Sequence, residues 1–575
     1  MELLRKTVSG IMLTLLFIGT LTPAFNLRLS GAQPATIVVP DDYPTIQEAI
    51  DAANPGDTIY VRSGIYEGNV YVSKSLSLIG ECKNTTVIVG DGRGNVVDIV
   101  ADNVVISRFS IKHAGNYFSG IFLENSSSSF VFDNNVEDNY YGVKLYNCSN
   151  CLVFRNNATN NRWGHIVLDS SHNCSVLNNF VAGNWMGIYL LNCSDCSISR
   201  NIIAKANGSG IELEHSSGCS ISRNHAYNSD WGICMRACDA CFILGNIVEN
   251  NSRCDIQLVG CSGCSNERNT AGVQLVGCSN CSISSNVGYI SVQKSSGCSL
   301  HSNFLRFLIA FNNSDICFSR NIVINKIVDL TQAYDWSISD NILVNTTITF
   351  YGSNNCSLFG NIFKKCNLSI GTFKHPASNN KIYHNIFVNS TVHVETGTIN
   401  IWDDGYPSGG NYWSDYAGVD MYSGPYQNET GSDGIGDTPY VIEKYNQDNY
   451  PIMTPPEFLD KYLRTLSTYY VLNATYESQY VRLCDYDVLL IAYYDILTNY
   501  DLLNSSYNSL NAGYNSLNAS YNEVNTRLDA TISELNDIRN LMYVFITTTV
   551  ILATITAYFV VRRKTNTKTQ KMDIH

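Results

Sequence analysis

An asparagine recurs once per repeat along the middle of the chain, and this recurrence limits the folds that the chain can adopt. Successive asparagines are 22 or 23 residues apart up to Asn269 and 17 to 24 residues apart after it. A fixed return of this length is typical of a solenoid, in which each turn stacks on its neighbours. The asparagines of this ladder are Asn134, Asn156, Asn179, Asn201, Asn224, Asn246, Asn269, Asn286, Asn303, Asn321, Asn341, Asn361 and Asn385.

The residues around the asparagines alternate between apolar and polar, in the pattern G-I-x-L-x-x-C-x-x-C-x-I-x-x-N. Such alternation predicts short strands with one face turned inward. Repeats of 22 or 23 residues fit three short parallel strands joined by turns. The sequence therefore predicts an all-β fold, a right-handed single-stranded parallel β-helix of about 13–15 coils over residues 35–400. The shorter repeats after Asn269 predict that one turn or strand is trimmed there and that the cross-section changes.

The recurring asparagine has a structural interpretation. A side-chain amide in an inward turn can donate a hydrogen bond to the coil on one side and accept one from the coil on the other. Repeated at every turn, this satisfies backbone groups that would otherwise be buried without a partner. We therefore expect the thirteen asparagines to form a structural ladder rather than a catalytic or binding site.

The two ends of the chain carry targeting features. Residues 1–34 begin with Arg5 and Lys6 before an apolar run, which predicts an export signal peptide. Residues 541–561 carry no charge and are long enough for a transmembrane helix, and the basic residues of 562–575 predict a cytoplasmic tail. We expect an exported, cell-surface protein with a single C-terminal anchor. The net charge of −13 makes nucleic acid an unfavourable partner.

Two further segments lie between the repeats and the predicted anchor. Residues 401–453 are rich in Gly, Asp and Tyr without periodicity, and we expect them to cap the last coil. Residues 454–540 contain eight consecutive heptads from Tyr486, which predict a coiled-coil stalk. A stalk of this kind would allow the chain to form an oligomer.

Three sequence blocks resemble a known family. They are TIQEAIDAANPGDTIYVRSGIY at the start, the coils with GIxL and CSISRN, and GGNYWSDYAGVD followed by GSDGIGDTPY near the end. Together they resemble the NosD-like right-handed parallel β-helix proteins of archaeal surfaces over about residues 36–453. The resemblance implies a carbohydrate-binding or sugar-hydrolase type of β-helix. The family takes its name from a periplasmic protein linked to copper-site maturation of nitrous oxide reductase. Members with a stalk and a C-terminal anchor usually have no assigned activity, so the name implies little chemistry for this chain.

The cysteines form a second periodic column. Eighteen of the twenty cysteines lie between residues 148 and 366, and five coils carry C-x-x-C. Three interpretations are open: a column of small buried side chains, disulfides between neighbouring coils, or a soft-metal site. The same column also accepts serine, isoleucine and tryptophan, which favours the first interpretation.

Candidate binding residues lie outside the ladders. An outward row of aromatic residues could offer stacking platforms to sugar rings, although the same residues could simply shield a turn. This row consists of Tyr141, Trp163, Trp185 and Trp231.

Two acidic groups suggest other chemistry. Glu212 and Glu214 flank an inward leucine, so both should face outward, and paired acids are what a polysaccharide lyase or hydrolase requires. The cap aspartates could bind Ca²⁺, the one cofactor that the sequence indicates, or form ordinary Asx turns. These aspartates are Asp415, Asp420, Asp433 and Asp437.

The leading hypothesis from the sequence is a membrane-anchored extracellular β-helix that binds a polysaccharide or a cell-surface glycoprotein without catalysis. The first alternative is a polysaccharide lyase or hydrolase that acts through Glu212 and Glu214. The second is a metal-handling, NosD-like protein that binds copper through the cysteine columns.

Overall fold

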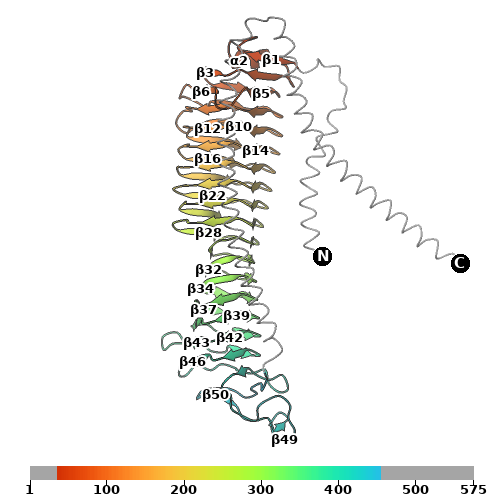
Figure 1. Cartoon of the computed structure of the whole chain (residues 1–575), viewed down its shortest axis with the longest axis vertical. Helices are drawn as coiled ribbons and strands as arrows, with labels where there is room; N and C mark the ends of the chain where they lie inside the picture. The colour runs from red at the N-terminus through yellow and green to blue at the C-terminus, as the bar shows by residue number, and fades with distance from the viewer. Residues whose placement is uncertain (1–34, 455–575) are drawn as a thin grey trace, which may run out of the picture. The chain divides into compact units, whose positions relative to one another are not determined.

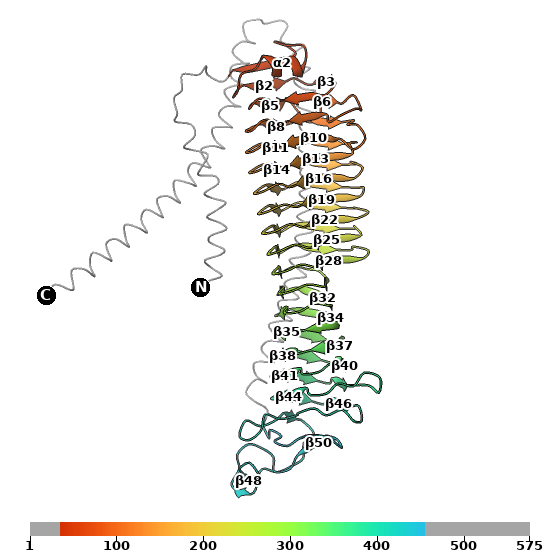
Figure 2. The same ribbon diagram turned by 180° about the vertical axis from the view of Figure 1, so that it is seen from behind.

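The computed structural model describes residues 35–454, which form a parallel β-solenoid (Figures 1 and 2). Most turns pass through three sheets in a constant order, as β2, β3 and β4 do near the start. Every pairing between successive turns is parallel, because each strand is joined to its neighbour through a complete coil. The pairing stays in register apart from a shift between Gly288 and Ile290. The expected all-β fold is confirmed.

The first sheet contains seventeen strands and runs the length of the solenoid. Its strands are β1 (Thr36–Val39), β2 (Thr58–Val61), β5 (Ser77–Gly80), β8 (Val105–Ser107), β11 (Phe130–Phe132), β14 (Leu152–Phe154), β17 (Ser175–Leu177), β20 (Ser197–Ser199), β23 (Ser220–Ser222), β26 (Phe242–Leu244), β29 (Ser265–Glu267), β31 (Ser282–Ser284), β33 (Ser299–His301), β35 (Cys317–Ser319), β38 (Ser337–Ser339), β41 (Ser357–Phe359) and β44 (Lys381–Tyr383).

The second sheet follows the ladder asparagines and contains nine strands. They are β3 (Gly64–Glu67), β6 (Thr86–Val89), β9 (Ser110–Lys112), β12 (Asn135–Glu137), β15 (Asn157–Thr159), β18 (Phe180–Ala182), β21 (Ile202–Ala204), β24 (His225–Tyr227) and β27 (Ile247–Glu249). Further along the solenoid the same position is taken by β36 (Ile322–Ile324), β39 (Ile342–Val344), β42 (Ile362–Lys364), β45 (Ile386–Val388) and β47 (Tyr412–Trp413).

The third sheet completes each turn. Its strands are β4 (Val70–Val72), β7 (Val97–Ile99), β10 (Ser119–Glu124), β13 (Tyr141–Tyr146), β16 (Gly164–Asp169), β19 (Met186–Leu191), β22 (Ser209–Glu214), β25 (Trp231–Arg236), β28 (Cys254–Val259), β30 (Val273–Val276), β32 (Val287–Gln293), β34 (Phe304–Ser314), β37 (Ile327–Tyr334), β40 (Thr347–Tyr351), β43 (Asn367–Ile370) and β46 (Thr391–Val394).

The number of turns exceeds the expected 13–15, because the first sheet has seventeen strands. Four of them, β1, β2, β5 and β8, belong to turns that come before the turn of the first ladder asparagine. The β8 turn places Phe109 where later turns place the asparagine, and Phe109 is fully buried. The repeat of asparagines therefore does not mark these turns. The helix α2 (Ile46–Ala52) packs Ile46, Ala49 and Ile50 into the core beside them, as its pattern predicts.

The solenoid changes at Asn269, as the shorter repeats predict. The second sheet ends at β27, and the next turn retains only the isolated bridges of Thr270 to Ile247 and Val287. Ala271 and Gly272 then lead directly into β30, so the turn that joins the second and third sheets in the longer coils is missing. Further along, β34 pairs with both β36 and β37, and the two sheets merge.

The core consists of inward columns that repeat from turn to turn. Aliphatic side chains at matching positions of the strands are buried, as Ile198, Ile221 and Ile243 show in the first sheet. The cysteine column belongs to the same core, for example Cys219 and Cys241. All nineteen cysteines of the described residues are free, so the structure contains none of the disulfides that the sequence left open.

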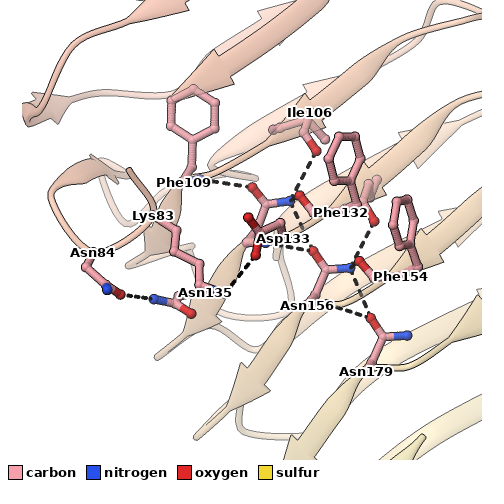
Figure 3. A network of polar contacts seen from close by, with 12 residues as sticks. Lys83, Asn84, Ile106, Phe109, Phe132, Asp133, Asn135, Phe154, Asn156 and Asn179 are labelled. Atoms are coloured by element: carbon pink, nitrogen blue, oxygen red, sulfur yellow. Dashed lines mark hydrogen bonds and ion pairs between the residues drawn. The ribbon is translucent and has the colours of Figure 1, made fainter. Parts of the chain in front are cut away.

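The ladder asparagines form the network that the sequence predicts (Figure 3). The amide oxygen of Asn156 accepts hydrogen bonds from the backbone N–H and the amide nitrogen of Asn134, each at 3.1 Å. Its own nitrogen donates to the carbonyl of Val131 at 2.9 Å and to the amide oxygen of Asn179 at 3.1 Å. The ladder therefore joins the backbone of each turn to its neighbours, and it continues through Asn411, which the sequence search did not include.

The last turns end on β51 (Asn446–Asp448), which pairs with β50 (Tyr440–Glu443); β48 (Tyr422–Ser423) and β49 (Glu429–Thr430) form a second hairpin. The Asp448 carboxylate accepts from the backbone of Asn411 and so ends the asparagine ladder. The cysteine column continues from Cys356 through Asn380 to Asn400, each asparagine accepting from the backbone N–H of the member before. The Asn446 amide oxygen accepts from the backbone N–H of Asn400 and so ends this column. One strand of residues 401–453 thus closes two columns.

Several predictions fall outside the described residues. These are the signal peptide of 1–34, the coiled-coil stalk of 454–540 apart from its first residue, the transmembrane helix of 541–561 and the basic tail of 562–575. Among residues 35–454, no helix has the length and apolarity needed to cross a membrane.

Candidate carbohydrate-binding face

The outer surface of the third sheet carries an in-register column of polar and aromatic side chains. Its central members occupy the x position of the G-I-x-L pattern on consecutive turns: Lys144, Val167, Tyr189, Glu212 and Cys234. Neighbouring strands in a sheet lie about 4.8 Å apart, so these side chains contact one another along the solenoid axis. We refer to the outer surface of β10 to β28 as the binding face.

A chain of five aromatic rings crosses the N-terminal part of the binding face, from β10 to β19. Tyr117 lies 4.7 Å from Tyr140 between ring centroids, and Tyr140 lies 4.8 Å from Tyr141. Trp163 then packs edge to face against Tyr141 and Tyr189, at 5.4 Å from each. Edge-to-face pairs of this kind stabilise the orientation of each ring. The arrangement presents several partly exposed rings in a fixed geometry.

Charged groups surround this aromatic chain. The Lys144 ammonium lies 4.9 Å from the centroid of the Tyr141 ring, a cation–π distance. The Tyr189 hydroxyl donates to Glu214 at 2.8 Å. Burial, followed by this hydrogen bond, raises the pKa of Tyr189. The Tyr189 hydroxyl therefore remains a neutral donor at physiological pH.

The two predicted catalytic glutamates have different environments. The expectation that both face solvent is wrong for Glu212, which is 2% exposed because side chains of adjacent turns stack over it. Glu212 forms an ion pair with Arg236, two positions beyond Cys234 on the next turn. Glu214 is partly exposed and accepts the Tyr189 hydroxyl. Both carboxylates thus have partners within the protein, and Glu212 cannot reach a polymer on the surface, so the geometry does not favour a pair of catalytic acids.

The structure brings together only part of the predicted aromatic row. Tyr141 and Trp163 contact each other, whereas Trp231 lies under the Arg253 guanidinium at 4.4 Å. Trp185 is 52% exposed and makes no ring contact with any other residue of 35–454. Trp163 is therefore the centre of the aromatic chain, and Trp185 and Trp231 are separate exposed or partly exposed rings.

Three members of the aromatic chain, Tyr117, Tyr140 and Tyr189, were not among the residues predicted from the sequence. The signal for Tyr189 was present, because it occupies the outward position between two inward apolar residues of β19. Its column also holds lysine, valine and glutamate, so no periodic aromatic pattern marked it. Tyr117 and Tyr140 lie before strands, where the repeat gives no orientation.

The four cap aspartates accept hydrogen bonds from other residues of the cap. Asp420 accepts from the backbone N–H groups of Asp433 and Gly434, and Asp437 accepts from those of Met421 and Tyr422. Asp433 accepts from the backbone of Ile435, and Asp415 accepts from the hydroxyl of Tyr440. Only the Asp433 bond, to the residue two positions on, is that of an Asx turn. Asp415, Asp420 and Asp437 instead join segments that lie 13 to 25 residues apart in the sequence. Calcium binding at these carboxylates stays a prediction.

Comparison with known families now identifies the chain's relatives. A family model described as "Periplasmic copper-binding protein (NosD)" matches residues 56–258 and 256–418, well over half of the chain. The chain belongs to the NosD family. The resemblance seen in the sequence is therefore confirmed, together with the right-handed parallel β-solenoid that it implies. No curated protein matches the chain.

Solved structures similar to this NosD-family chain are distant in sequence. The mannuronan C-5 epimerase AlgE4 A-module of Azotobacter vinelandii is 15% identical, with 60% of this chain and 94% of that chain covered and a TM-score of 0.31. PfbA, a surface adhesin of Streptococcus pneumoniae, is 12% identical, with 73% and 98% covered and a TM-score of 0.29. Gene product 12 of bacteriophage phi29 is 13% identical, with 64% and 69% covered and a TM-score of 0.40. Likenesses at this level carry no argument about function.

The NosD description names copper, so the cysteine columns must be tested as ligands. Within residues 35–454, no group of three or more His, Cys, Asp and Glu side chains is placed to hold a metal ion. The Cys148 thiol donates to the carbonyls of Leu123 and Tyr146, both at 3.4 Å, in the manner of a ladder amide. Burial raises the pKa of Cys356 to about 12 and that of Cys366 to about 11, which disfavours the thiolate that metal binding requires. Within the C-x-x-C pairs the direction alternates, because hydrogen bonds between neighbouring thiols lower the pKa of Cys151 and Cys238 and raise that of Cys148 and Cys241. The described residues do not fit a copper site.

The burial of the cysteine side chains predicts how their thiols react. In the folded protein at pH 8, a thiol reagent is expected to modify rapidly only Cys82 and Cys317 among the described cysteines, since the other seventeen are buried. After unfolding in guanidinium chloride, all described cysteines should react. Mass mapping of the labelled sites checks this, and metal analysis after purification under reducing conditions is the companion measurement. Stoichiometric copper that protects the column thiols after partial unfolding would contradict the core assignment.

Proposed function

We propose that this protein binds a polysaccharide on the binding face without cleaving it. The observation that carries the proposal is the aromatic chain centred on Trp163, flanked by Tyr141 and Tyr189. Sugar rings present C–H faces that pack on aromatic rings, while their hydroxyls take hydrogen bonds from groups at the edges. Lys144 and Glu214 supply such groups beside the rings.

The shape of the binding face supports a linear ligand. Tyr141, Trp163 and Tyr189 follow one another on successive turns, so a polymer that lies parallel to the solenoid axis meets several rings in succession. Bound in this way, several sugar units contribute at once, and weak contacts add together. A neutral or mixed polysaccharide, including the glycan of a cell-surface glycoprotein, fits this description.

The same proposal places the protein outside the cytoplasm, in keeping with the periplasmic family description. The predicted anchor at 541–561 and the heptads of 454–540 would hold the solenoid at the cell surface, as a monomer or as an oligomer. Calcium at Asp415, Asp420, Asp433 and Asp437 would stabilise the cap rather than take part in ligand binding.

Replacing Trp163 with alanine should weaken binding of the preferred polysaccharide by about ten- to a hundredfold, because it removes the ring that orients both neighbours. The ligand is first identified by screening the full-length chain on a glycan array, and the affinity is then measured by isothermal titration. Phe373→Ala is the matched control, because Phe373 is 93% exposed and lies on a loop after β43.

Two outcomes would overturn the proposal. Equal affinities of the Trp163→Ala variant and the wild type would move the site elsewhere, and an array without any bound glycan would remove the function. New reducing ends or unsaturated products after incubation with the polysaccharide would instead support the lyase or hydrolase alternative. In that case, loss of product formation in Glu214→Gln with unchanged ligand affinity would assign the chemistry to the binding face.

A further inference from the structure

Six arginines occupy a single column of the solenoid, at the turn between the first and second sheets. Each follows the last residue of a first-sheet strand and precedes the residue at the ladder position, and the in-register pairing of those strands places the six in line. They are half of the twelve arginines in residues 35–454, and all six are exposed. The members of this arginine column are Arg108, Arg155, Arg200, Arg223, Arg268 and Arg320.

Most of the arginine column has no partner in the described part of the chain. No ion pair or side-chain hydrogen bond joins Arg155, Arg200, Arg223 or Arg320 to another of the described residues. Arg268 forms an ion pair with Glu267 of its own turn, at 3.1 Å. These four guanidinium groups are thus free to bind a ligand, in a chain whose net charge is −13.

The two carboxylates of the column do not neutralise it. Asp133 occupies the position between Arg108 and Arg155 but is held by Lys83 at 2.8 Å (Figure 3). Asp340 lies one turn beyond Arg320, at the end of the row. The row from Arg155 to Arg320 therefore contains no carboxylate at the turn position itself.

The turn does not require arginine. All six arginines have positive φ, for example 56° at Arg200 and 55° at Arg223, a backbone conformation that favours glycine and asparagine. The same column holds Asn178 and Gly245, which meet this requirement more easily. The backbone conformation of the turn therefore does not favour arginine over asparagine or glycine. The reason for arginine at these positions must lie in its guanidinium group.

The spacing of the arginines fits a linear polyanion. Arg200 and Arg223 lie on consecutive turns, and the other gaps are two or three turns, so that the row extends over ten turn spacings, about 48 Å at about 4.8 Å per turn. The guanidinium group binds carboxylate and sulfate in a bidentate manner. Serine hydroxyls of the adjoining sheet face, such as Ser199 and Ser222, lie beside the row and can bind sugar hydroxyls.

We propose that the arginine column binds a linear acidic polysaccharide, with carboxylate or sulfate groups along the solenoid axis. This is a second surface, separate from the binding face, and it does not depend on ligand binding at Trp163. A single row along one corner of the solenoid suits an extended chain better than a flat bilayer.

The test measures binding of the full-length chain to heparin, polygalacturonate and neutral dextran, over a range of salt concentrations. Each contact releases counterions, and for double-stranded DNA log K falls with log salt by about 0.9 per neutralised charge. With that slope as an upper value, the four unpaired arginines make the affinity fall about 100-fold between about 50 and 200 mM salt, and two contacts make it fall about 10-fold. The Arg200→Gln/Arg223→Gln variant should show the shallower dependence and bind about ten- to a hundredfold more weakly.

The control is Arg93→Gln/Arg306→Gln, which removes two exposed arginines outside the column and so matches the change in net charge. The expected result is binding to one or both acidic polysaccharides, none to dextran, and a loss confined to the column variant. Equal affinities of both double variants would overturn the proposal. Tighter binding to single-stranded DNA or to phosphatidylserine vesicles than to either polysaccharide would also overturn it, because the ligand would then be another polyanion. Trp163→Ala should leave this binding unchanged, which separates this result from that of the binding face.

Discussion

Replacing Asn201 with alanine is expected to destabilise the turns around it by about 3–5 kcal/mol. The Asn201 amide oxygen accepts from the backbone N–H and the side-chain nitrogen of Asn179, at 2.9 and 3.0 Å. Its nitrogen donates to the carbonyl of Val176 and to the amide oxygen of Asn224, at 2.9 and 3.0 Å. All of these groups are buried, and each that loses its partner costs about 1–3 kcal/mol. Because one substitution leaves several of them unpaired, the expected loss is large.

Native-state hydrogen exchange is the appropriate measurement, since a solenoid transmits stability mainly between neighbouring turns. Amides of residues 176–226 should lose protection in Asn201→Ala, while those beyond about residue 300 should keep it. Asn178→Gly is the matched control, because Asn178 is exposed and has a φ of 54° that glycine adopts readily. Uniform loss along the whole solenoid, or unchanged protection near Asn201, would contradict the ladder's role.

Lowering the pH from about 8 to about 5 is expected to stabilise the solenoid through Asp448. This carboxyl is fully buried beneath β47 and accepts from the backbone of Asn411 at 2.7 Å and from the Trp413 indole at 2.9 Å. Burial outweighs these hydrogen bonds and raises its pKa to about 7. The unfolded carboxyl ionises near pH 4, so the unfolded state loses its proton first as the pH rises. Stability therefore falls between about pH 4 and pH 7, by about 4 kcal/mol, and is level above that range.

The Asp448→Asn variant isolates this contribution. An asparagine keeps one amide oxygen as an acceptor and cannot ionise, so the variant should show a flatter dependence of stability on pH. Denaturant unfolding of both proteins between pH 4.5 and 8.5 checks this, and the difference between the two curves removes the effect of other titrating groups. If both proteins lose stability in parallel as the pH rises, Asp448 does not carry the effect.

The repeat made most of the fold predictable. Asn134 and its successors mark a turn whose amide position is filled in the same way thirteen times, and the interatomic contacts follow from that repetition. The ends of the solenoid were harder to predict from the sequence. At the start, Phe109 replaces the amide with apolar packing, and at the far end Asp448 replaces it with a carboxylate from a strand 37 residues beyond Asn411. Neither Phe109 nor Asp448 belongs to a repeating sequence pattern, so the repeat does not mark them.

The candidate site was only partly predictable, for a related reason. Tyr141 and Trp163 each stand directly before the recurring glycine of the repeat, so their matching positions marked them as a row. Tyr189 and Glu212 share an outward column with Lys144, and the exposure of such residues depends on which side chains the adjacent turns place beside them. Alternation alone says that a side chain points outward; it does not say that Glu212 is covered by its neighbours.

Hydroxyl-radical footprinting of the full-length chain with a bound oligosaccharide shows whether the ligand lies on the binding face. The ligand should protect Tyr141, Trp163 and Tyr189 from oxidation, because sugar rings cover these side chains. Phe373 and Tyr445, which are exposed at a distance along the chain, should be oxidised to the same extent with and without the ligand. Protection that spares all three residues of the aromatic chain, while the oligosaccharide is bound, would contradict the assignment of the binding face.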